Sequence, residues 1–348
     1  MEDYKNQILQ QFTFGEIDQV LSDILEEPLS FGDILKAVIT GDFTMLEGIE
    51  FISKNMVQQL IQDKNLILYI FILCLVASLY TVFTTNLKDK QVSETFFYVV
   101  YIMITLLLMK GFGELLATVR QGAVNLSMFM KVLIPSYSLG IAFSVGYESA
   151  TGFYQCNLMM ISILSDLLCV VLLPAIEIFV VLRLLNQLFM DDYTKAMADV
   201  FLKICSFFLK VAMSALIGMQ VIQSMVLPAI DTFKNAAFTK GAMAIPGIGN
   251  SIGAVTELFM GAAILVKNGM GVVAIMIIII LVLPIFFKIF LYIAVFKILA
   301  ALLQPVSDKR LTGCMESVWE GGIMVLKCSG MVAGMFMISI ALIAMKTK

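Results

Sequence analysis

Six ionisable side chains lie inside long apolar runs of this sequence, and their chemistry has to be explained first. A charge at the centre of a bilayer costs at least about 2.5–3.5 kcal/mol, so such residues typically line polar paths or pair with one another. The alternative is that the lysines reach the lipid headgroups through their flexible stems, or that the apolar helices end sooner. The six residues are Asp166, Glu177, Arg183, Lys210, Lys288 and Lys327.

Two of these residues occupy comparable positions in two apolar runs. Glu177 follows Pro174 by three residues, and Lys288 follows Pro284 by four. Opposite charges at matching places predict an ion pair across an interface between two similar halves of the protein.

A glycine- and proline-rich stretch at 241–253 is a second feature that indicates a polar path at membrane depth. Gly and Pro both disfavour helix interiors, and unpaired backbone at membrane depth must line a cavity or be buried in protein. We therefore expect a re-entrant or broken helix here and at 134–140, with a polar path between them; a surface loop followed by a kink is the alternative. The predicted path residues are Pro135, Gly140, Asp166, Glu177, Pro246, Gly247, Gly249, Asn250 and Lys288.

Several kinds of chemistry find no support. The sequence has no histidine, the commonest general base, and its cysteines lack CxxC spacing and read as core residues. Walker A, GxGxxG and HExxH motifs do not occur in a usable context. Nor do Lys and Arg cluster as nucleic-acid binding requires. We expect no catalytic residues, no cofactor, no metal site and no nucleic-acid partner. The cysteines are Cys74, Cys156, Cys169, Cys205, Cys314 and Cys328.

The bulk composition is that of a membrane protein. Of 348 residues, 60% are hydrophobic and only 14% are charged, with a net charge of -3 and a mean hydropathy of +0.96. A soluble domain carries about 25% charged residues. The sequence predicts an all-α, polytopic membrane protein in a lipid bilayer, with about six or seven membrane-embedded elements.

Four regions follow from the pattern of charge and hydropathy. Residues 1–64 carry twelve acidic side chains against four lysines, a net of -8, and read as amphipathic helices of a small soluble region. No cleavable signal peptide is visible at its start. A transmembrane hairpin follows at 65–120, and the lysines on its short turn place the 1–64 region outside the cytoplasm. Two membrane repeats are expected at 121–232 and 233–348.

Three matched landmarks predict this internal duplication. Ile134-Pro135 matches Ile245-Pro246, Leu173-Pro174 matches Leu283-Pro284, and Leu209-Lys210 matches Leu326-Lys327, in the same order along both halves. The three offsets are similar, at 111, 110 and 117 residues, and recurring landmarks at a similar spacing are typical of repeated units.

The second half resembles a known family. The stretches AIPGIGNSIGAVTELF (244–259), GAAILVKNGMGVVAI (261–275) and VLPIFFKIFLYIAVFKILAALLQPVSD (282–308) are similar to the stage III sporulation protein AE family. The polar landmarks VKNG and QPVSD are its most specific features. This resemblance implies a polytopic subunit of the channel complex that the mother cell builds toward the engulfed forespore. The implied partners are ring-forming proteins and a separate ATPase, in the mother-cell membrane around the forespore, with self-association left open.

A second function remains compatible with the same residues. A self-contained secondary transporter would also use two repeats and broken helices, with its substrate path between the repeats. The acidic 1–64 region, which has little core of its own, favours docking within an assembly instead.

Overall fold

The structure is a computed structural model. It describes residues 14–25, 30–41, 90–145, 148–188, 194–242, 249–304 and 308–346, with a few positions between 68 and 79. The path residues Pro246 and Gly247, and most of the expected first span, lie outside the described residues.

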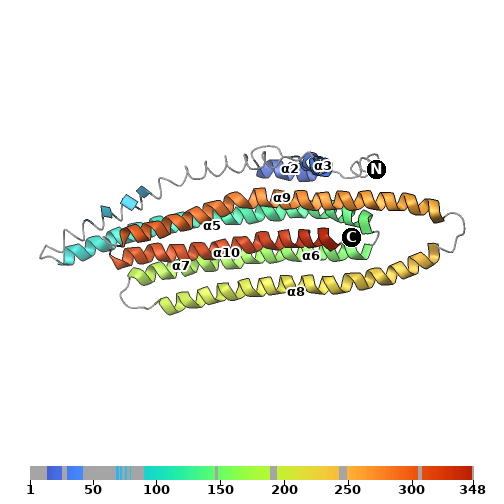
Figure 1. Ribbon diagram of the computed structural model, residues 1–348. Helices are drawn as coiled ribbons and strands as arrows, with labels where there is room; N and C mark the ends of the chain where they lie inside the picture. The colour runs from blue at the N-terminus through green and yellow to red at the C-terminus, as the bar shows by residue number, and fades with distance from the viewer. Residues whose placement is uncertain are drawn as a thin grey trace.

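Long antiparallel helices make up the described part of the chain (Figure 1). α6 and α7 form one continuous run, and each of the other long helices runs back along the run before it, so the connections lie at the two ends of an elongated bundle. Five of the helical stretches are long and apolar enough to cross a membrane, which confirms the all-α polytopic class. The elements are α2 (Gly15–Ile24), α3 (Phe31–Thr40), α5 (Lys90–Val145), α6 (Glu148–Leu167), the π-helical segment η1 (Leu168–Leu172), α7 (Leu173–Leu188), α8 (Lys195–Ala242), α9 (Gly249–Leu303) and α10 (Lys309–Lys346).

The break expected at 134–140 is wrong, because α5 continues through Pro135 as one helix of 56 residues. Pro284 likewise lies inside α9. In an apolar medium the backbone has to keep its hydrogen bonds within the chain, and neighbouring helices can support a proline there. These two prolines therefore lie within membrane-type helices without ending them.

Pro174 has a different local effect. Proline lacks the N–H that would bond the carbonyl four residues earlier, that of Val170. The residues just before Pro174 form η1, a short π-helical segment that joins α6 to α7, so the helix continues from α6 into α7. Such wide turns accommodate a missing bond inside a continuing helix.

Two of the expected region boundaries lie inside helices, and the boundary at 64/65 lies outside the described residues. Residues 120 and 121 both lie within α5, and 232 and 233 both lie within α8. The hairpins α7–α8 and α9–α10 run in the same sense along the bundle, but the duplication itself stays a prediction.

The amino-terminal helices form a small pair that packs on the bundle. Ile17, Leu21, Phe31 and Leu35 are buried, with α2 against α5 and α3 against α9. Ser30 caps α3 by accepting from the Asp33 N–H at 3.3 Å. The acidic region thus carries an apolar face that the long helices cover.

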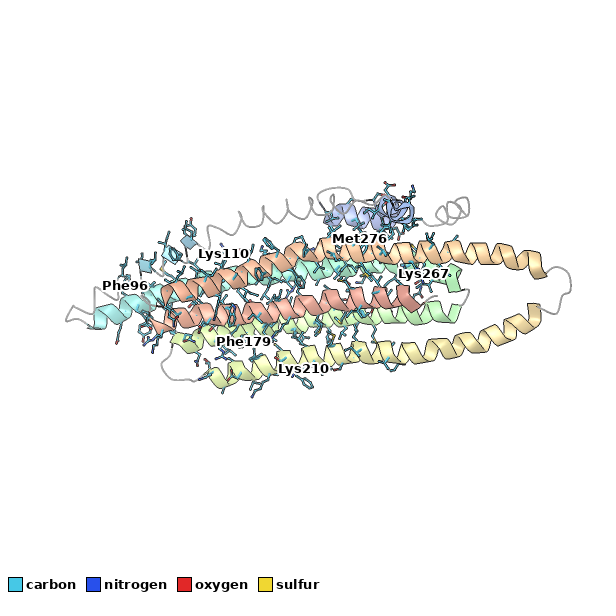
Figure 2. The ribbon with its side chains drawn as sticks, in the orientation of Figure 1. Phe96, Lys110, Phe179, Lys210, Lys267 and Met276 are labelled. Atoms are coloured by element: carbon cyan, nitrogen blue, oxygen red, sulfur yellow. The ribbon has the colours of Figure 1, made fainter. Side chains whose placement is uncertain are left out.

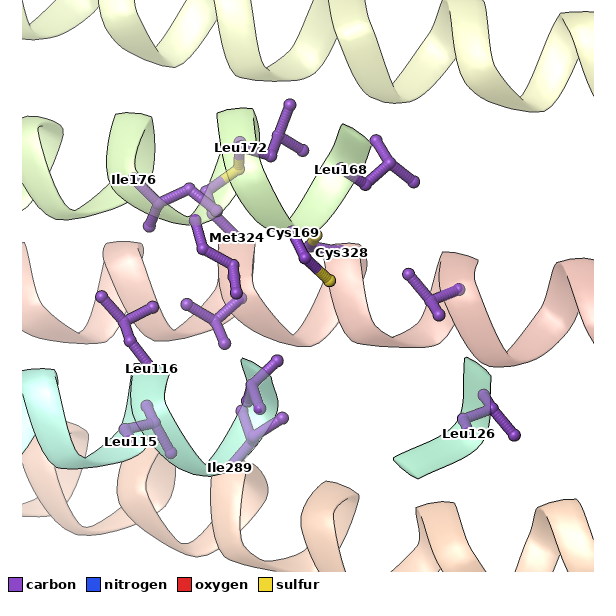
Figure 3. Close-up of a cluster of buried hydrophobic side chains, with 14 of the residues drawn as sticks. Leu115, Leu116, Leu126, Leu168, Cys169, Leu172, Ile176, Ile289, Met324 and Cys328 are labelled. Atoms are coloured by element: carbon purple, nitrogen blue, oxygen red, sulfur yellow. The ribbon is translucent and has the colours of Figure 1, made fainter. Parts of the chain in front are cut away.

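The core of the bundle is a continuous cluster of apolar side chains from several helices. Figure 3 shows Leu115 and Leu116 of α5, Leu172 of η1 and Ile289 of α9 turned toward Met324 of α10. The free cysteines Cys169, Cys205, Cys314 and Cys328 are all buried. Their role as small core residues agrees with the sequence expectation.

Glycine lets α10 approach its neighbours at one level of this core. A Cβ added at Gly321 would collide with Val180 of α7 and lie 3.1 Å from the Phe112 ring of α5. On the same helix, a Cβ at Gly334 would meet nothing within 4 Å. Close packing of α10 on α5 and α7 therefore needs the missing side chain at Gly321.

We expect Gly321→Leu to lower the free energy of unfolding by about 1–3 kcal/mol, because overpacking a core forces helices and rotamers apart. The matched control is Gly334→Leu, which we expect to leave stability close to the parent. Thermal unfolding of the purified proteins in detergent measures both. Equal melting temperatures for the two variants would contradict this packing.

Candidate functional site

A buried lysine at the contact between α5 and α9 is the main candidate. Lys267 of α9 is 0% exposed, in a stretch where α9 packs on α5 (Figure 2). Lysine is almost never fully buried unless its ammonium group is satisfied. A buried cation in a membrane helix is by default a functional candidate.

Small residues allow this contact. A Cβ added at Gly140 of α5 would collide with Met270 and lie 3.8 Å from the Lys267 Cβ. A Cβ added at Gly271 of α9 would lie 3.0 Å from the Tyr137 hydroxyl oxygen of α5. Two glycines, one on each helix, thus bring the α5 and α9 backbones together around Lys267. Asn268 follows Lys267 in the sequence, and its buried Oδ1 accepts no hydrogen bond from the part of the chain that the structure describes.

Among the predicted path residues whose surroundings the structure describes, Gly140 lies at this contact. Pro135, five residues earlier on α5, is exposed. Gly249 and Asn250 begin α9, and their side chains lie outside what the structure describes, as do Pro246 and Gly247. Whether 245–253 faces Gly140 therefore stays a prediction.

The other predicted residues lie further along the bundle. Asp166 is exposed near the end of α6, and Glu177 is partly buried on α7. Lys288 donates from Nζ to the Thr118 hydroxyl of α5 at 3.3 Å. The structure brings Lys288 to Thr118 of α5 and places Glu177 on α7, and the pairing of Lys288 with Glu177 stays a prediction.

Sequence reasoning did not single out Lys267. The available signal was the polar landmark VKNG, three of whose residues interrupt one of the most apolar runs in the chain. Periodicity could not show that Lys267 faces another helix, because α9 is apolar on all sides.

A polar network ties three helices together near the other end of the bundle. The Arg183 guanidinium of α7 donates to Asp199 of α8 at 2.9 Å and lies 3.9 Å from the Glu320 carboxylate of α10. One cation therefore bridges two carboxylates from separate helices, which fixes their relative register. Arg183 was predicted as an intramembrane charge, and its partners explain how it is tolerated.

A second buried network joins α5, α7 and α10 nearby. The Tyr101 hydroxyl donates to the Leu184 carbonyl, and the Cys314 thiol donates to the Tyr101 oxygen at 3.1 Å. Because every partner is buried, this chain of bonds specifies one arrangement of the three helices.

An open cavity of about 600 Å³ lies at the same end, between α7, α9 and α10. Lys297 lines it, 3.8 Å from the Glu316 carboxylate and 4.1 Å from the centre of the Trp319 ring. Its polar lining residues are Gln187, Lys297, Gln304, Lys309, Thr312 and Glu316. Two ammonium groups with neutral donors suit an anionic group, while Glu316 already neutralises part of that charge.

We expect Lys267→Met to keep or raise the stability of the protein. Methionine has similar length and flexibility and fills the same space between α5 and α9. The desolvation cost of the ammonium group and the interactions of that group are lost together, and the net cost of burying the charge decides the sign. Lys131→Met, on the exposed side of α5, is the matched control and should leave stability unchanged. Thermal unfolding in detergent measures this, and a large loss of stability in Lys267→Met alone would show that Lys267 holds the fold together.

Comparison with known proteins places the chain in a family. The sequence model of stage III sporulation protein AE matches residues 29–347. A curated relative, stage III sporulation protein AE of Bacillus subtilis (strain 168), is 21% identical over 337 residues, covering 94% of this chain and 84% of the relative. No solved structure matches the chain. The match spans every long helix described above, and the chain therefore belongs to the stage III sporulation protein AE family.

Proposed function

We propose that the chain is a multi-pass membrane subunit of the channel complex that the mother cell builds toward the forespore during endospore development. The observation that carries this proposal is the family match over residues 29–347. The five membrane-type helices support a place within a bilayer. The absence of a Walker A motif from the sequence supports an energy source on another chain.

The proposed setting follows from the same role. Ring-forming channel proteins and a separate ATPase would be the partners, in the mother-cell membrane around the forespore. The amino-terminal helices would lie outside the cytoplasm, as the lysines Lys88 and Lys90 on the first hairpin turn favour. The role is structural and transport-related, without catalysis by this chain.

A self-contained secondary transporter is the second candidate, and the buried Lys267 favours it. Transporters place buried ionisable groups where helices meet at membrane depth. Uptake by purified protein in vesicles, lost in Lys267→Met, would support this candidate over the channel subunit.

We expect deletion of the gene to abolish forespore-specific reporter activity after engulfment, while engulfment itself finishes normally. Collapse at this stage is what loss of a subunit of a channel between the mother cell and the engulfed forespore would cause. The measurement is single-cell reporter fluorescence with a membrane dye, with the restored wild-type gene as control. Unchanged reporter activity and spore yield would contradict the proposed function.

We expect Lys267→Met to lower spore yield while the protein still accumulates in the membrane, because an apolar replacement keeps the fold and removes the ammonium group. Lys131→Met should support a normal yield. Heat-resistant spore counts together with an immunoblot of the membrane fraction test the pair. Wild-type yield in both variants would remove Lys267 from the functional site.

A further inference from the structure

The open cavity of about 600 Å³ between α7, α9 and α10 is a site that the proposed function does not use. Its polar lining consists of two lysines, one glutamate, two glutamines and a threonine. Between them the wall is formed by small residues, Ala300, Ala301 and Gly313. Genuinely empty cavities in proteins are apolar, so a lining of this kind indicates a polar occupant.

The donors that a ligand would meet come from all three helices. A Cβ added at Gly313 would lie 2.6 Å from the Gln187 Cδ, so the Gln187 amide of α7 lies directly against the α10 backbone. The Thr312 hydroxyl already donates to the Lys309 carbonyl at 3.0 Å. The groups left to donate are two ammonium groups and two amides, those of Lys297, Lys309, Gln187 and Gln304.

The charges of this lining favour an occupant with one negative charge. Two lysines and one glutamate give the lining a net charge of +1. The Glu316 carboxylate lies 3.8 Å from the Lys297 Nζ, while Lys309 has no ion-pair partner among the described residues. A phosphodiester carries a single negative charge, and its oxygens accept strong hydrogen bonds from ammonium groups. Glu316 remains as an acceptor for a donor on the same ligand.

The cavity lies where membrane-type helices end. Candidate membrane spans end at Leu188 and Leu303, and another begins at Lys309. Figure 1 shows the ends of α7 and α9 at the same end of the bundle as the start of α10. Trp319, the single tryptophan of the chain, has its ring centre 4.1 Å from the Lys297 Nζ. Tryptophan is enriched where a membrane meets water.

Exposed apolar side chains border the cavity. On α9, Ile298 and Leu302 are 57% and 60% exposed, and each directly follows a lining residue. On α5, the exposed Ile102 directly follows Tyr101, whose oxygen accepts from the Cys314 thiol of α10. A cationic, polar pocket between membrane helices, with apolar surface beside it, suits a lipid headgroup.

We propose that this cavity binds the phosphodiester of a glycerophospholipid whose headgroup also carries a hydrogen-bond donor, as in phosphatidylglycerol and phosphatidylethanolamine. The Lys297 and Lys309 ammonium groups donate to the phosphate oxygens, and Glu316 accepts from the headgroup hydroxyl or ammonium group. The acyl chains lie along Ile298 and Leu302. The inference goes beyond the proposed function and does not depend on it, because it concerns a lipid site of this chain by itself.

Trp319 reports on this site without an added label. The full-length protein is purified and reconstituted into phosphatidylcholine vesicles that contain an equal small fraction of phosphatidylglycerol, phosphatidylethanolamine or phosphatidylcholine with brominated acyl chains. Bromine quenches nearby tryptophan, and each value is compared with the same lipid without bromine. Lys309→Gln removes one ammonium group from the lining. Lys327→Gln, at an exposed lysine of the same helix outside the lining, is the matched control.

We expect brominated phosphatidylglycerol and phosphatidylethanolamine to quench Trp319 more strongly than brominated phosphatidylcholine, which has no headgroup donor. Lys309→Gln should weaken the apparent affinity for phosphatidylglycerol about threefold to tenfold, because a charge-assisted hydrogen bond at a partly exposed site is lost. Lys327→Gln should match the parent. Equal quenching by the three lipids, or a preference that survives Lys309→Gln unchanged, would overturn the proposal.

Glu316→Gln is a second, independent variant. It removes the acceptor for the headgroup ammonium while both lysines remain, so we expect it to weaken quenching by phosphatidylethanolamine more than quenching by phosphatidylglycerol. An equal effect on both lipids would remove Glu316 from the site. Parent-like melting temperatures in detergent show that each variant is folded.

A soluble competitor identifies the source of the phosphodiester. Glycerophosphoglycerol, the headgroup without acyl chains, should leave the quenching unchanged when added at the concentration of the brominated lipid. Displacement at that concentration would show that the cavity takes a free phosphodiester and would overturn the lipid assignment. Because purified protein is used, failure of this proposal and failure of the proposed function in the spore assays are distinguishable.

Discussion

Backbone hydrogen bonding in an apolar surrounding is the constraint on which the rest of this structure depends. With little water available, each amide has to bond within its own helix, and the described chain accordingly forms helices of up to 56 residues. Pro135 and Pro284 remain inside such helices, and Pro174 is accommodated by the π-helical segment before it. Continuous helices then set the elongated form of the bundle and leave side-chain packing to decide how the helices associate.

Burial of apolar surface does little to select which membrane helices pack together, because lipid is as apolar as leucine. Two other kinds of contact supply the specificity here. Glycines such as Gly140 and Gly321 let backbones approach, while a few polar bridges fix the register. Arg183 holds α7, α8 and α10 together, and Tyr101 does the same for α5, α7 and α10. Such contacts are satisfied in one arrangement only.

The charged residues in the apolar helices therefore differ in what explains their presence. Arg183 and Lys288 have protein partners that explain their presence. Lys267 is the most deeply buried charged side chain among the described residues, and it lies at a contact of α5 and α9 that Gly140 and Gly271 allow. Because Lys267 is a buried cation in a membrane-type helix, the α5–α9 contact is the main candidate for a functional site in this member of the family.

The sequence by itself determined the helical class, the membrane setting and the family, because composition and the VKNG and QPVSD landmarks are local properties. It also drew attention to Gly140, since a glycine in an apolar run is visible without a fold, although the polar path predicted for Gly140 stays a prediction. Only the tertiary structure decided that α5 continues through Pro135, that Lys288 bonds Thr118 of α5, and that Lys267 is buried. Those outcomes depend on which helix faces which, and helices that are apolar on every side carry no sequence signal for that choice.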